Sequence, residues 1–175
     1  MSTSEILLTQ TVEAHQWTNK LIDAVPFGKW DETPPTIESN ISWQVGHLIT
    51  SQHYHAIMCV HGVQGELMEK IPFRDYAKLF AFGSPASDCV GRVNPENLKS
   101  HLVLVQEWSE KLIKNLTEEE MDEPLHATKM PNPVAKTKFQ AISWNIKHIM
   151  WHCGQIAILR RLVSHPVDFG IKKPE

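Results

Sequence analysis

Apolar residues recur at helical intervals in four long stretches of the chain, and two of these lie in its N-terminal third. One covers residues 4–24 and is ended by Pro26, and the other covers residues 40–61, with Asn40 or Ser42 as the residue that caps the helix. No stretch shows the sustained alternation of apolar and polar residues that marks a strand. The pattern therefore predicts an all-α protein.

The other two long helices are expected in the second half of the chain. Asn94 supplies a cap and Pro95 suits a first helical turn, so a third helix is predicted from there to about residue 115. A short helix capped by Thr117 should follow it. Residues 137–164 contain no proline, and we predict that they form the last and longest helix.

Residues 62–94, between the second and third helices, are rich in glycine and proline and too long for a tight turn. We predict a crossover that contains short helical pieces. Four long helices with one long connection are typical of a four-helix bundle, and the crossover permits an up-down-down-up order. A chain of 175 residues has the length for one core, so residues 1–175 are expected to form a single domain.

Charge and cysteine content narrow the class of protein. The 17 Lys and Arg residues against 20 Asp and Glu residues give a net charge of -3, which argues against binding to nucleic acid. No apolar run reaches the ~18 residues that cross a bilayer. Three cysteines without CxxC spacing fit reduced thiols better than disulfides, so we expect a cytoplasmic protein without a membrane anchor.

Ten histidines are the unusual feature of the composition, and three of them form a pattern. Residues 41–47 and 142–148 share the frame I-S-W-x-aliphatic-x-H, ending at His47 and His148. His152 follows His148 at the i, i+4 spacing, which places both imidazoles on one stripe of the last helix together with Leu159 and Leu162.

His47 lies on the inward stripe of the second predicted helix, so three imidazoles are expected to face one another in the bundle. Three nitrogen ligands can hold a divalent metal and leave a coordination position open for chemistry. Ser51, Tyr54 and Gln155 lie on the same stripes and are candidates for contacts to the ligands or to a small-molecule substrate. No catalytic residue is assigned beyond the metal ligands.

Other interpretations of these residues remain open. A single histidine on an apolar face is more often a satisfied core residue than a ligand, and an HxxxH pair can arise by chance. His53, His55 and His61 are expected to be solvated or at the rim of the site. Three tryptophans, Trp43, Trp144 and Trp151, are expected to fill the bundle interior and form the walls of the pocket. Cys59 and Cys153 are expected to be packing residues.

Known catalytic motifs do not explain the pattern. The single E-x-x-H contains Pro124, which excludes a di-iron carboxylate bundle, and the sequence has no HExxH, no GxSxG and no phosphate-binding glycine loop.

Two blocks of sequence resemble the DinB/YfiT-like metal-binding superfamily: I-S-W-x-x-G-H-L, ending at Leu48, and H-x-x-x-H-x-G-Q-I, ending at Ile156. The resemblance implies a four-helix bundle with up-down-down-up topology and a divalent metal, nickel or zinc, held by three histidines. His47, His148 and His152 match those positions. The resemblance also implies that homodimers are possible.

What the resemblance implies about reaction is broader. Some members are S-transferases that use low-molecular-weight thiols, and others are isomerases. The leading hypothesis is a metal-dependent enzyme that joins a thiol to an electrophile during detoxification, in which the metal lowers the pKa of the thiol. The alternatives are a metal-dependent hydrolase and a non-catalytic, stress-related metal-binding bundle.

Overall fold

The computed structural model describes residues 2–168, and within that range helices are its only regular elements. The long helices are α1 (Thr3–Asp23), the continuous helix formed by α2 (Ile41–Gln52), η2 (His53–Met58) and α3 (Cys59–His61), then α6 (Pro95–Lys114) and α8 (Lys138–Val163). The predicted all-α architecture with four long helices is confirmed.

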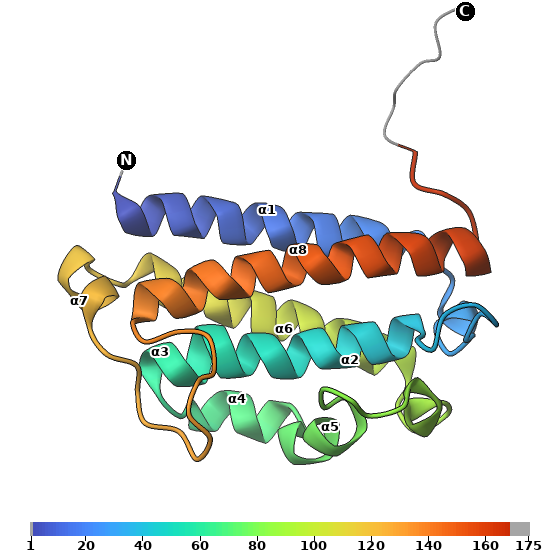
Figure 1. Ribbon diagram of the computed structural model, residues 1–175, viewed down its shortest axis with the longest axis horizontal. Helices are drawn as coiled ribbons and strands as arrows, with labels where there is room; N and C mark the ends of the chain where they lie inside the picture. Colours follow the sequence, from blue (N-terminus) through green and yellow to red (C-terminus); the bar gives the residue numbers. More distant parts are fainter. Residues whose placement is uncertain (1, 169–175) are drawn as a thin grey trace, which may run out of the picture.

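The four long helices pack as a bundle. α1 lies beside α8 and α2 beside α6, and contacts of α1 with α6 and of α2 with α8 close the arrangement (Figure 1). Followed along the colour scale, α1 and α8 run in one direction, and α2 and α6 run in the other (Figure 1). None of the helices within residues 2–168 combines the length and apolar character needed to cross a bilayer.

Capping side chains fix where these helices begin. Asn40 Oδ1 accepts from the backbone N–H of Trp43, and Asn94 Oδ1 accepts from that of Glu96, directly after the proline expected in the first turn. Thr137 caps α8 in the same way. The predicted helix starts are therefore confirmed to within a residue or two.

The crossover between α3 and α6 contains short helical pieces, which confirms the prediction. They are α4 (Gly65–Lys70), α5 (Phe73–Leu79) and the 3-10 turn η3 (Ala86–Cys89). α5 packs against α2 and brings Phe80 onto the bundle. Two further short elements are η1 (Phe27–Lys29) and α7 (Glu118–Asp122). The crossover thus supplies one wall of the region around His47.

Two of the sequence predictions for α8 are wrong. Trp151 is 65% exposed and Leu162 is 49% exposed, although both were expected on the buried side. The buried face of α8 is centred on Ile149 and Ile156, which lie about 80–100° around the helix from His148. His148 therefore stands at the edge of the buried face, and residues on its far side meet solvent.

Candidate metal centre

α2 and α8 bring three imidazoles together, and His47, His148 and His152 are called the histidine cluster below. One potential ligand atom from each of them lies within 4.8 Å of the others. His152 is buried, and His47 and His148 are partly exposed. These are the three histidines that the sequence pattern placed on facing stripes, and they could hold one metal ion.

In two of these rings Nδ1, called the outer nitrogen because it points away from the other rings, is hydrogen-bonded to an oxygen atom of the protein. His47 Nδ1 lies 2.8 Å from the carbonyl oxygen of Phe80, which can only accept, so Nδ1 carries the proton. His152 Nδ1 lies 2.6 Å from Oε1 of Gln44. Both rings therefore direct an unprotonated Nε2 toward the cluster.

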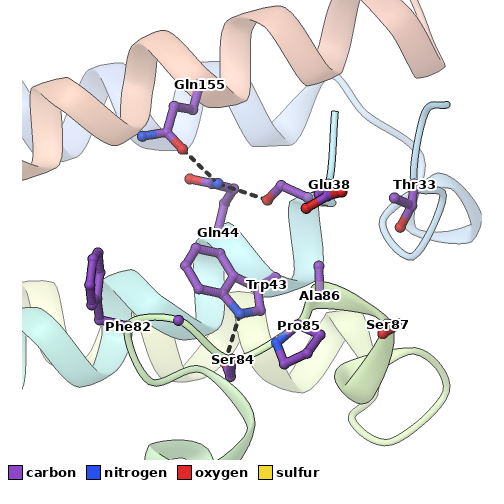
Figure 2. A pocket seen from close by; sticks show the side chains of 12 residues that line it. Thr33, Glu38, Trp43, Gln44, Phe82, Ser84, Pro85, Ala86, Ser87 and Gln155 are labelled. Carbon is purple, nitrogen blue, oxygen red and sulfur yellow. Dashed lines mark hydrogen bonds between the residues drawn. The ribbon is translucent and has the colours of Figure 1, made fainter. Parts of the chain in front are cut away.

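The amide orientation of Gln44 supports this assignment. Its Nε2 donates to Ser39 Oγ and to Gln155 Oε1, each at 2.9 Å. Gln44 Oε1 is therefore the acceptor for His152. Gln155, expected near the ligands, acts one step behind them through Gln44 (Figure 2).

His148 is held differently. Its Nδ1 lies 2.9 Å from Ser51 Oγ, and its Nε2 lies 3.1 Å from Nε2 of His152. Because Nε2 of His152 is a bare acceptor, the second contact needs a proton on His148 Nε2 or a cation between the two nitrogens. The Ser51 hydroxyl can donate or accept, so it suits either state. The three rings therefore fit a metal ion that takes the place of that shared proton.

Two tryptophans stack on the cluster and explain the repeated sequence frame. Trp43 stacks on His47 with 5.0 Å between ring centroids, and Trp144 lies nearly parallel to His148 at 6.0 Å. Each pair uses the i, i+4 spacing of the shared W-x-x-x-H segment. Both tryptophans are partly buried beside the site, whereas Trp151 is not, as described above.

Burial keeps the cluster neutral. Burial, with a smaller effect from neighbouring histidines, lowers the pKa of His148 to about 4 and that of His152 to about 3. Burial also lowers the pKa of His47, which the hydrogen bond to Phe80 opposes. Neutral imidazole is the form that binds metal, so the rings need not lose a proton to solvent near neutral pH.

A fourth histidine lies beside the cluster and is half-buried. His55, expected at the rim, has its ring centroid 6.3 Å from that of His148. It lies in η2, a π-helical segment, which turns less per residue than an α-helix and so keeps His55 nearer the His47 face. Burial and the His47 ring lower the pKa of His55 to about 4.

The hydrogen bonds of Asn132 fix the tautomer of His55. Asn132 Oδ1 accepts from the backbone N–H groups of Val134 and Ala135, so its Nδ2 is the donor to His55 Nδ1 at 3.1 Å. The neutral ring of His55 therefore carries its proton on Nε2. Within residues 2–168 that nitrogen has no partner and is not a fully buried atom, so it is an available donor.

The remaining candidates are distributed around the site. Tyr54 donates its hydroxyl to the carbonyl of Met130, in the segment before α8, and does not contact the cluster through that group. His53 was expected to be solvated or at the rim, but it is 5% exposed and its ring centroid lies 3.7 Å from that of Phe73, on which it stacks. The reason is that α2 also packs against α5, so a residue turned away from α8 still meets protein.

Comparison with known proteins places this site in context. A family model described as the DinB superfamily matches residues 10–156. A conserved protein of Enterococcus faecalis, known from its crystal structure, superposes with a TM-score of 0.70 at 15% identity, over 93% of this chain and 98% of that one. At that identity the likeness shows the fold alone. A comparison with curated proteins found no match.

Proposed function

The chain belongs to the DinB superfamily, and on that basis we propose that it is a divalent-metal-dependent enzyme that transfers a low-molecular-weight thiol to an electrophile. The observation that carries the proposal is the convergence of the histidine cluster, with each outer nitrogen held by the protein and each inner nitrogen turned toward the others. Such outer contacts orient metal ligands and set their tautomers.

The donor set favours zinc or nickel. Three neutral imidazoles are borderline donors, which suit these ions better than the hard ions calcium and magnesium. No fourth protein ligand joins the three histidines within residues 2–168, and three-ligand sites keep a position for substrate. A structural metal would be enclosed by four.

A thiol is the nucleophile that this environment suits best. No carboxylate is among the groups that contact the cluster in residues 2–168, so no acidic side chain is placed to take a proton from the nucleophile. The metal, when bound, lowers the pKa of a coordinated thiol. A thiol with a free pKa of about 8.5 needs a much smaller shift than water to ionise near neutral pH.

Residues of the chain orient the three ligand rings and cover them with apolar surface. Ser51, Gln44 and the Phe80 carbonyl hold the ligand rings, while Trp43 and Trp144 cover two of them with indole. His55 offers an N–H donor beside the histidine cluster, where it can hydrogen-bond an electronegative atom of the substrate.

Cobalt substitution tests the proposal. Protein loaded with Co²⁺ should gain a sulfur-to-cobalt charge-transfer band when a low-molecular-weight thiol is added, and zinc-loaded protein should consume the thiol with a chromogenic electrophile. His148→Ala should lose both signals, whereas His165→Ala, which changes an exposed histidine, should lose neither. Stoichiometric cobalt without a thiol band would contradict the transferase.

A further inference from the structure

A cavity of about 590 Å³ lies beside the histidine cluster, between α2, α8 and the loops around Glu38 and Ser84 (Figure 2). Its volume falls within the range of small-molecule sites. Two of its lining residues also contact the cluster: Gln44 accepts from His152, and Trp43 stacks on His47. A molecule in this cavity would touch the groups that position two of the three histidines.

The charge of the lining is one-sided. Glu38 is the only charged side chain among the twelve residues that form the cavity, and none of them is lysine, arginine or histidine. Within residues 2–168 no ion pair involves Glu38. Hydroxyl and amide groups make up the rest of the polar lining. An anionic ligand would find no cationic partner here.

Two aromatic residues also line the cavity. Trp43 Nε1 donates to Ser84 Oγ at 3.0 Å, which fixes the orientation of the indole. Phe82 is 95% exposed at the edge of the cavity, so its ring lies in water with almost no protein contact. A ligand that covers Phe82 would remove that apolar surface from water, and an indole face also attracts cations.

We propose that this cavity binds a small organic cation, with a flat apolar part against Trp43 and Phe82 and a protonated amine near Glu38. The site consists of the cavity lining and does not include the metal ligands. Joined to the proposed function, it gives the charge class of the electrophilic substrate, and that second step rests on the proposed function.

Calorimetric titration with three matched probes tests the inference: 2-phenylethylamine as the cation, 2-phenylethanol as the neutral form and 3-phenylpropanoate as the anion. We expect the cation to bind at least about tenfold more tightly than the anion. Equal binding of cation and anion, or no saturable binding of the cation, would overturn the proposal.

Matched variants locate the binding. Glu38→Gln should lower the affinity for the cation about threefold, which is the effect of one exposed charge pair, and leave the affinity for the neutral probe unchanged. Phe82→Ala should lower the affinity for both the cation and the neutral probe. Glu32→Gln, which changes another exposed carboxylate on the same loop, should change neither. An unaltered affinity in Glu38→Gln contradicts the assignment.

One variant distinguishes a failure of the metal proposal from a failure of the cation proposal. His148→Ala should lose metal and still bind 2-phenylethylamine, because His148 is not part of the cavity lining. Loss of probe binding in that variant while the fold is retained would place the probe at the cluster and overturn the inference.

Discussion

Each histidine of the cluster gives one ring nitrogen to the protein and keeps the other for the site. For His152 the protein partner is Gln44, whose own amide is held by Ser39 and Gln155. Such outer partners are worth about 10–100-fold in metal affinity. The orientation of the ligands is therefore a property of residues that never touch the metal.

Gln44→Leu should lower zinc affinity about 10–100-fold, because His152 loses the acceptor that fixes its tautomer. Gln44→Glu retains an oxygen at the same distance and should keep affinity close to that of the unaltered protein. Competition with a chromogenic chelator measures both. Equal affinities in the Leu and Glu variants would mean that the hydrogen bond to Nδ1 does not matter.

The buried side chain of His53 makes the stability of the protein depend on pH. Burial lowers its pKa from 6.5 to about 4 in the folded protein. Between these values the unfolded chain binds a proton that the folded protein does not, so the free energy of unfolding falls as pH falls through this window. The contribution of this residue is at most about 3 kcal/mol.

In metal-free protein, His53→Met should therefore reduce the loss of stability between pH 7 and pH 4.5, as measured by urea unfolding at each pH. The exposed residue change His165→Met serves as the control and should leave the pH dependence unaltered. A His53→Met curve that parallels that of the original protein would contradict a buried neutral imidazole.

The convergence of the histidine cluster could be predicted at this scale, because helical spacing alone places His148 and His152 on one stripe. The acceptors could not. Gln44 lies three residues before His47 on α2, but its partner His152 belongs to another helix, and the Phe80 carbonyl belongs to a crossover whose path depends on packing. Residues distant in sequence leave no periodic signal.

At the scale of elements, the contact between α2 and the crossover controls His47. Gly46 lies against the ring of Phe80, and a Cβ built at Gly46 would come within 2.4 Å of that ring. The carbonyl of the same phenylalanine accepts from His47. The glycine beside the ligand thus permits the approach that positions the ligand.

Gly46→Ala should destabilise the protein by about 1–3 kcal/mol, the usual cost of overpacking a filled core, and should also weaken zinc binding as Phe80 moves. Gly154→Ala is the matched control on α8, where an added Cβ meets nothing within 4 Å. It should stabilise the protein by roughly 0.5–1 kcal/mol. Denaturant unfolding with and without zinc measures both effects. A Gly46→Ala protein as stable as the original would contradict the close approach.

Element boundaries were predictable from local chemistry, since the caps at Asn40, Asn94 and Thr137 are made by residues next to the helix they start. The π-helical segment η2 was not. Nothing in the periodicity of residues 53–58 marks it, and it turns His55 toward the cluster. This local change in helix geometry accounts for the closeness of His55 to His148.

Across the whole molecule, a metal in the cluster would join α2 to α8. These helices are separated by about a hundred residues and contact one another directly in the bundle. A ligand that binds only the folded protein stabilises it in proportion to the logarithm of its concentration over its dissociation constant. The metal would therefore act on global stability as well as on chemistry.

Zinc at 100 times its dissociation constant should raise the free energy of unfolding by about 2.7 kcal/mol, and a chelator should reverse the gain. Thermal unfolding followed by circular dichroism measures the difference. In His148→Ala the same zinc should give little stabilisation. An equal gain in both proteins would place the ion elsewhere.

The most direct test of the account is the metal content of the protein purified without an affinity tag, determined by elemental analysis. We predict one zinc or nickel ion per chain, retained through gel filtration, and none in His148→Ala. Protein that carries no divalent metal and takes up none on dialysis against zinc or nickel would contradict the metal centre.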